Sequence, residues 1–563
     1  MPNTEGSLAL AVNHYGRTTV AIMLKTKRQL STACLLVLLL IFTGSLAARQ
    51  QKPLSERDLI ELLAGGVYSG RIEALIEDRG IAFVPTRASL ERLRKAGAQE
   101  SLEHAVAVAP QIMPKEERPH THPHARLRAT LSRPTLPHNQ PATAPSIASK
   151  SQPALKPEAR VAPGTTINMS NWVKYQQYMP VGMLELFQGK HFWKMPPDIE
   201  INVGPTIAYS LPRGYTEATR ANSKSVRVVH LANGHYDIAN YRGGVPFPDP
   251  QDPDKGYKLL ADLWFAYTPH LVAGTARNPL STCSETSDGY INCTRFSYVF
   301  RQLAYNTDLG SPVNERGVPD TWYTEWMSVE EPEQMRYTTI LTLYPKDNQQ
   351  PKELFTFVPA LRRWIRGSPA SRCHPIPGTD YTEDDYKMEG FNGGIGASKA
   401  QFIGHQQILA LTGTYAPLGG DFPTNYYMPL GWPKPSWGAW QLRDVDAVDV
   451  RPIASERTSY CYGKRILYED STTHYALWED VYDTDMRLWK TAYLAQRMIA
   501  GGSLGYVPAG FNSSAWDMKN DHMTNTSTQS RNGADVLIDD NVPKEYQSVT
   551  SYSTTAGLAE IMR

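Results

Sequence analysis

The stretch from Tyr460 to Leu494 constrains the fold of this chain more than any other. Between Tyr462 and Asp470, consecutive side chains alternate between two faces, and each face mixes apolar and charged residues. A repeat of two residues is the period of a β-strand. Polar turn residues at 469–473 and 483–485 divide the stretch into three segments of strand length. Three consecutive strands with short turns predict an antiparallel meander, whose aromatic face has to be covered.

The meander carries two pairs of large aromatic residues. Trp478 precedes Tyr482 by four positions, and Trp489 precedes Tyr493 by four positions. Large rings on an open sheet face favour burial against another layer or against a ligand. Trp478, Tyr482 and Trp489 are therefore candidate contacts for a hydrophobic ligand.

The rest of the large domain also favours strands over helices. An Asn233-Gly234 turn predicts a hairpin, and a helix is predicted to end at Gly189 with a weak point at Met179-Pro180. The pattern indicates one antiparallel sheet rather than alternating βαβ units. The predicted strands are 225–232, 235–241, 294–304, 336–344, 353–358 and 400–411, and the predicted helices are 172–188 and 255–267.

Two sequence segments of the meander, YGKRILYED at 462–470 and ALWEDVYDTDMRLWK at 476–490, resemble the C-terminal motif of the bacterial family DUF1329. Tyr241–Pro250, Phe355–Arg366 and Met388–Gly393 resemble further motifs of this family, in the same order. The resemblance implies an α+β, mainly antiparallel fold: a large curved half-barrel sheet, like that of lipoprotein carriers, with a few covering helices. Such a sheet is expected to shelter acyl chains, and no biochemical activity comes with the family.

The first 48 residues have the organisation of a signal peptide. Basic residues at 25–28 precede an apolar run at 33–42 and small residues at 44–48. The chain is therefore predicted to be exported, and the mature protein is predicted to begin near residue 48 or 49. Together with the family resemblance, export implies a location in the periplasm or at the periplasmic face of the outer membrane. An uncleaved membrane anchor is the alternative, and either Met1 or Met23 could be the true start.

Four further regions follow the signal peptide. A small all-α module is expected at 49–109, a proline-rich disordered linker at 110–163, the half-barrel at 164–499 and a C-terminal extension at 500–563. The helical module could dock onto an envelope protein or could simply add stability. The C-terminal extension could be a flexible tail or a strap across the sheet.

Composition and motifs exclude several kinds of chemistry. The 57 basic and 56 acidic residues nearly cancel, so no basic face for nucleic acid is expected. No phosphate-binding loop or zinc-type cysteine pair occurs. His120, His122 and His124 lie in the linker without preorganised geometry, so we expect neither a metal site nor a cofactor.

A GxSxG pattern at Gly501–Gly505 offers Ser503 as a nucleophile. His522 and Asp517 or Asp521 follow it and could complete a triad. However, Pro508 makes a helix directly after the serine unfavourable, and the nucleophile elbow requires one. A serine hydrolase is therefore the alternative to a binding protein.

Arg362, Arg363 and Arg366 follow the strand predicted at 353–358. Guanidinium groups donate two parallel hydrogen bonds, which suits phosphate or carboxylate headgroups. The same side chains could instead pair internally with the acidic run at 383–385.

Four cysteines follow the signal peptide, and an oxidising compartment favours their pairing. Cys283 and Cys293 flank an Asp288-Gly289 turn signal, so we predict that they pair across a hairpin. Cys373 and Cys461 then pair by elimination.

Composition and periodicity predict an exported sheet protein with an aromatic-rich face and no recognisable active site. The family resemblance then implies a non-enzymatic protein that binds or transfers a hydrophobic ligand, a lipid or lipoprotein acyl chain, on the concave face of the sheet. The alternatives are a serine hydrolase that uses Ser503 and a structural envelope protein.

Overall fold

The computed structural model describes residues 53–109, with gaps between 65 and 79 and at 99, and residues 160–560, with short gaps between 309 and 319 and at 369–371, 377, 386 and 414–421. The chain divides into two compact units, 1–148 and 149–563. The predicted signal peptide, His120, His122, His124 and nearly all of the predicted linker lie outside the described residues.

The described part of the first unit contains helices. Ser55 and Asp58 exchange hydrogen bonds at the start of one helix, α2, and Thr86 and Ser89 form a capping box at the start of another, α4. Leu59, Leu93 and Leu102 are fully buried in one small core. The described helices are α2 (Glu56–Ala64), α4 (Arg87–Lys95) and α5 (Glu100–Val108).

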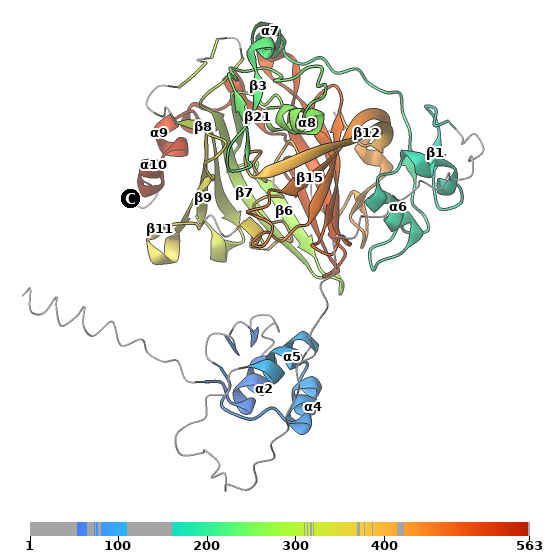
Figure 1. The fold of residues 1–563 in the computed structure, drawn as a ribbon, viewed down its shortest axis with the longest axis vertical. Coiled ribbons are helices and arrows are strands. Elements are labelled where there is room, and N and C mark those ends of the chain that lie inside the picture. Colours follow the sequence, from blue (N-terminus) through green and yellow to red (C-terminus); the bar gives the residue numbers. More distant parts are fainter. Residues whose placement is uncertain are drawn as a thin grey trace, which may run out of the picture. The chain divides into compact units, whose positions relative to one another are not determined.

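The second unit is built on a 15-stranded antiparallel sheet that runs from an edge at β11 to an edge at β12 (Figure 1). In sheet order the strands are β11 (Arg363–Arg366), β10 (Glu353–Val358), β9 (Thr339–Pro345), β8 (Thr321–Glu331), β7 (Ile291–Gln302), β6 (Leu280–Glu285), β20 (His522–Ser527), β19 (Tyr506–Asp517), β18 (Leu488–Ala500), β17 (Ala476–Tyr482), β16 (Lys464–Asp470), β15 (Gln441–Pro452) and β12 (Ser398–Ala410). Two short strands, β5 (Leu271–Gly274) and β21 (Leu537–Ile538), pair beside β7.

The predicted meander is confirmed as β16, β17 and β18, with Trp478 directly opposite Tyr493. The sheet does not stop at residue 499, however. Strands β19 and β20 continue it and connect β18 to β6. The part of the chain predicted as a C-terminal extension therefore begins with two central strands.

The sheet curves around helix α8 (Lys255–Trp264), which Figure 1 shows against its inner face. Tyr344 of β9 and Val448 of β15 belong to the same hydrophobic core as Leu260 of this helix. Strands β9 and β15 are nine places apart in the sheet, which is about 43 Å on a flat surface. A shared core therefore requires the strong curvature that the half-barrel expectation implied.

Other segments cover the outer face of the sheet. A 3-10 helix η1 (Trp172–Tyr178) and α6 (Val181–Gln188) meet at Met179-Pro180, the break predicted from the sequence, and α6 ends at Gly189 in a left-handed conformation.

The remaining α-helices and short strands of the second unit are β1 (Thr166–Ile167), β2 (Ile201–Asn202), α7 (Arg213–Asn222), β3 (Arg227–His230), β4 (Tyr236–Ala239), β13 (Tyr426–Tyr427), β14 (Trp432–Pro433), α9 (Val549–Ser553) and α10 (Thr555–Glu560).

Candidate functional site

A cavity of about 260 Å³ lies on the inner face of the sheet, over strands β7 to β10. Cross-strand register explains its wall, because Met327 lies opposite Ile340, and Ile340 lies opposite Thr356. Side chains at alternate positions of these strands point to one face. The apolar wall consists of Phe296, Met327, Val329, Met335, Ile340 and Leu354, with several threonines between them.

The opposite wall is a short hairpin, described at residues 375–376 and 378–382, which we call the roof hairpin. Pro375 and Thr382 pair as an isolated antiparallel bridge, and Ile376 donates its backbone N–H to the Tyr381 carbonyl at 2.7 Å. Ile376, Thr379 and Tyr381 line the cavity from this side. The cavity is thus the space between the roof hairpin and one half of the curved sheet.

Contacts with the other half of the sheet hold the roof hairpin in place. The Tyr381 hydroxyl and Ser513 Oγ are 2.7 Å apart, and the Asp380 backbone N–H donates to Thr524 Oγ1 at 3.0 Å. His522 Nδ1 lies 3.2 Å from Asp380 Oδ1. The roof hairpin therefore rests on β19 and β20, leaving space above β7 to β10.

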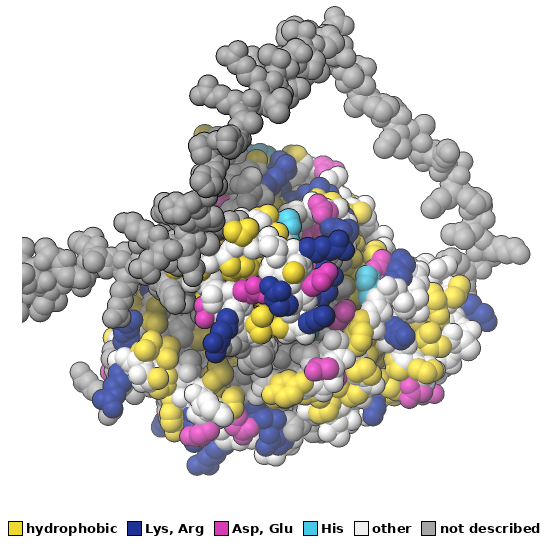
Figure 2. Space-filling view, turned by 90° about the horizontal axis from the view of Figure 1, so that it is seen from below, with side chains coloured by type: hydrophobic (Ala, Val, Ile, Leu, Met, Phe, Trp, Pro, Cys, Tyr) yellow, Lys and Arg dark blue, Asp and Glu magenta, His cyan; other side chains and the backbone are white. Residues whose placement is uncertain are grey.

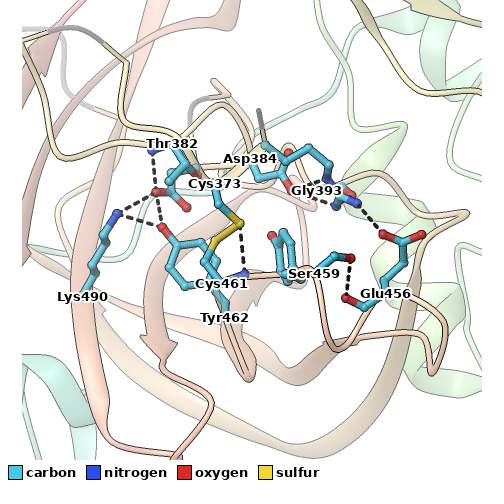
Figure 3. The surroundings of a disulfide bond; sticks show 12 residues. Cys373, Thr382, Asp384, Gly393, Glu456, Ser459, Cys461, Tyr462 and Lys490 are labelled. Carbon is cyan, nitrogen blue, oxygen red and sulfur yellow. Dashed lines mark hydrogen bonds and ion pairs between the residues drawn. A yellow bond between two sulfur atoms is a disulfide. The ribbon is translucent and has the colours of Figure 1, made fainter. Parts of the chain in front are cut away.

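A disulfide and a buried ion network fix the two ends of the roof hairpin (Figure 3). Cys373 and Cys461 are bonded, with their Sγ atoms 2.21 Å apart. Asp385 lies 2.7 Å from an Arg465 nitrogen and 3.1 Å from Lys490 Nζ, and it accepts a hydrogen bond from Tyr462 Oη at 2.7 Å. Burial opposes the ionisation of Asp385, but Lys490 and Arg465 outweigh it and hold the pKa of this carboxyl well below its usual range.

One end of the cavity is polar. Glu325 Oε1 accepts from the Tyr298 hydroxyl at 2.8 Å, and its Oε2 accepts from the Tyr344 hydroxyl at 2.9 Å. Burial raises the pKa of Glu325, and these hydrogen bonds oppose the rise. Lys352 Nζ donates to the Glu383 carbonyl at 2.7 Å. An apolar wall with a few polar groups at one end is typical of pockets for small apolar or amphiphilic ligands.

The aromatic residues singled out in the meander do not line this cavity. Trp478 is only 1% exposed on the outer face, where its Nε1 donates to Asp480 and Thr491. Tyr482 packs partly against the same outer core, and Trp489 packs edge-on against Tyr462. Of the two coverings that the sequence left open, another layer or a ligand, the structure shows another layer over Trp478, because α6 and the segment around Trp432 cover it.

The three arginines lie on or directly before β11 and, in the part of the chain that the structure describes, none of them forms an ion pair with the acidic run at 383–385. Arg366 pairs with Glu353 instead. The partners of the acidic run are other cations, since Asp384 pairs with Arg372 and Lys352, and Asp385 pairs with Arg465 and Lys490. Among the described residues, Arg362, Arg363 and Arg366 therefore do not form the ion pairs with residues 383–385 that the sequence left open.

Ser503 lies exposed in a 3-10 turn, η7 (Gly502–Leu504), between the antiparallel strands β18 and β19. A nucleophile elbow joins a strand to a helix instead. His522 pairs with Asp517 at the far end of β19, and the two ends of this strand are about 36 Å apart at about 3.3 Å per residue. Ser503 and His522 therefore cannot form a catalytic dyad.

The cysteine pairs of the large domain are both bonded. Cys283 lies directly opposite Cys293 across the β6–β7 hairpin, with the Sγ atoms 2.07 Å apart. Within the described ranges, no cluster of three or more His, Cys, Asp or Glu side chains could hold a metal ion. None of the described helices has the length and apolarity needed to cross a membrane. Figure 2 shows acidic, basic and hydrophobic side chains intermingled over one face, in keeping with the small net charge.

The sequence predicted strands at three of the four wall positions, β7, β9 and β10, but none of the candidate ligand contacts chosen from the sequence lines the cavity. Strand β8, which supplies Met327 and Val329, was not predicted, although residues 321–331 contain three aromatic residues, two threonines and a valine. No sequence pattern predicted the roof hairpin itself. Of the residues named from the sequence, Cys373 and the acidic run at 383–385 lie next to it.

Comparison with known proteins gives a family match but few functional clues. A family model described as "Protein of unknown function (DUF1329)" matches residues 166–556. A search of curated proteins finds no match.

Three solved structures are similar at low identity. A domain named for outer-membrane lipoprotein sorting from Vibrio parahaemolyticus is 11% identical, with a TM-score of 0.36, covering 55% of this chain and 99% of that one. A DUF1329 family protein from Desulfovibrio piger is 13% identical, with a TM-score of 0.36, covering 54% and 100%. A LolA superfamily protein from Nitrosomonas europaea is 13% identical, with a TM-score of 0.28, covering 54% and 93%.

Proposed function

We propose that this chain, which belongs to the DUF1329 family, is a non-enzymatic binding protein that shelters the acyl chain of a lipid in the cavity under the roof hairpin. The observation that carries the proposal is the apolar wall of the cavity. Met327, Ile340 and Leu354 are only half-buried, although they lie on the inner face of the sheet. Covering such a surface contributes about 25 cal/mol per Å² of apolar area, which favours an apolar ligand.

We also propose that the protein acts after export, in the periplasm or at the periplasmic face of the outer membrane. Two features support this location. The first 48 residues have the order of charged, apolar and small residues that a signal peptide has. Both disulfides are of the kind that persists in oxidising compartments.

Titration of the purified, delipidated protein with a fluorescent fatty acid tests the binding proposal. The wild type is expected to bind saturably. Ile340→Glu places a charge on the apolar wall, so it should weaken binding at least about tenfold, because an unpaired buried charge is costly. Circular dichroism verifies that each protein remains folded.

Ile403→Glu is the matched control, because Ile403 is 56% exposed on β12 and outside the cavity. It introduces the same charge and should bind like the wild type. A folded wild type that shows no saturable binding of fatty acid or phospholipid contradicts the carrier proposal and leaves a structural envelope role.

A further inference from the structure

The β11 edge of the sheet is both apolar and basic at its surface. All four residues of β11 are exposed, and Leu361, just before it, is 52% exposed. Trp364 and Ile365 are 39% and 43% exposed. Exposed apolar side chains on an edge strand invite association, and native proteins usually avoid them.

The same edge is basic. Residues 359–367 contain Arg362, Arg363 and Arg366 and no acidic residue, although the chain as a whole is almost neutral. Arg366 pairs with Glu353, whereas Arg362 and Arg363 form no ion pair with any residue that the structure describes. Two unpaired guanidinium groups therefore stand beside three exposed apolar side chains.

We propose that the β11 edge is a docking surface for a lipid bilayer that carries anionic headgroups. Arginine binds phosphate through two parallel hydrogen bonds, and a basic cluster next to exposed Trp and Ile side chains suits the boundary between headgroups and acyl chains. The docking surface consists of Leu361, Arg362, Arg363, Trp364, Ile365 and Arg366.

A second copy of the chain fits this edge less well. If two β11 strands paired antiparallel, the arginines of one copy would face those of the other, and like charges opposite each other destabilise a sheet. An anionic lipid surface instead meets the charge and the apolar side chains together.

The docking surface also adjoins the cavity. Ile365 lies directly opposite Thr356, and Thr356 lines the cavity. A bilayer at the β11 edge would therefore lie beside the β10 wall of the cavity. This arrangement provides a short route between the bilayer and the cavity, but the docking inference does not depend on whether the cavity binds a ligand.

Flotation of the purified full chain with vesicles tests the inference. The wild type should float with phosphatidylcholine vesicles containing about one third phosphatidylglycerol, and should not float with phosphatidylcholine alone. The variant Arg362→Gln/Arg363→Gln should bind the anionic vesicles about 25-fold more weakly, since each arginine near the surface contributes about fivefold. The remaining binding should depend less on salt.

Two further variants separate the contributions. Arg213→Gln/Arg487→Gln removes the same charge at exposed positions elsewhere, with side chains 80% and 72% exposed, and should float like the wild type. Leu361→Ser/Ile365→Ser should weaken flotation while leaving its salt dependence unchanged.

Four results would overturn the inference: a wild type that does not float with anionic vesicles, equal flotation with neutral vesicles, equal flotation of Arg362→Gln/Arg363→Gln and the wild type, or a dimer in sedimentation velocity that the same variant abolishes. The last result would assign the edge to a second copy.

Discussion

At the scale of single residues, the structure contains a carboxyl group in an unfavourable place. Glu285 ends strand β6, is 2% exposed, and its Oε2 has no hydrogen-bond partner among the described residues. Burial raises its pKa to about 7. The neutral form is therefore the one that the fold tolerates.

This raised pKa predicts a stability that depends on pH. The pKa of an unfolded glutamate is about 4.3, so the contribution of neutral Glu285 is fully present below about pH 4 and is lost as the pH rises through about 7. Glu285→Gln should therefore stabilise the protein at pH 8, by about 1 kcal/mol after solvent screening, and should have little effect at pH 4. Thermal unfolding followed by circular dichroism at both pH values measures the difference.

Asp485→Asn is the control, because its carboxyl is 69% exposed in the β17–β18 turn. An equal change of melting temperature at pH 4 and pH 8 for Glu285→Gln would contradict the pKa argument.

At the scale of elements, the roof hairpin determines whether the cavity exists. Its contacts are mostly polar, and one of its two ends is tied covalently through Cys373. Removing that tie should release the hairpin without exposing the large hydrophobic cores. The cavity should then become wider and wetter.

We predict that Cys373→Ser/Cys461→Ser lowers both stability and lipid affinity. The bond closes a loop with a sequence separation of 88, for which chain entropy gives about 4–5 kcal/mol. Denaturant unfolding measures the stability, and the fatty-acid titration measures the affinity of the protein that remains folded.

Cys283→Ser/Cys293→Ser is the matched control. Its separation is 10, so the expected loss of stability is about 3 kcal/mol, and it should leave affinity unchanged because these side chains lie in the outer core. Equal losses of affinity in both variants would show that the roof hairpin is not the relevant element.

The meander and several other long elements could be predicted from local signals, and the elements that were missed have physical reasons. Glu353–Val358 was predicted with its observed bounds because alternation and turn residues agree there. Strand β19 was missed because its polar residues, such as Asn512 and Ser513, are buried through hydrogen bonds that only the fold supplies.

At the scale of the whole molecule, the chain after residue 500 joins the two halves of the sheet. Strand β20 pairs with β6, and β19 pairs with β18. A chain that ends at Ala500 should therefore fail to fold, because β18 and β6 would become open edges in the middle of the core.

A chain that ends at Gln547 is the comparison. It lacks only α9 and α10, which cover the outer face of β8 and β9. It should keep its β-sheet circular dichroism but melt at a lower temperature. Folding of the chain that ends at Ala500 would contradict a sheet order in which β19 and β20 are central strands.

The sequence by itself determined the class of sheet, the meander, the two cysteine pairs and the broken helix before Gly189. These depend on neighbours along the chain: alternation, turn residues, a proline and the few ways of pairing four cysteines. Only the tertiary structure decided which face of the sheet is covered. Trp478 and Ile340 both lie on β-strands, yet one is sealed under α6 and the other faces the roof hairpin. The physical reason is that local alternation distinguishes two faces, whereas covering one of them depends on segments hundreds of residues away.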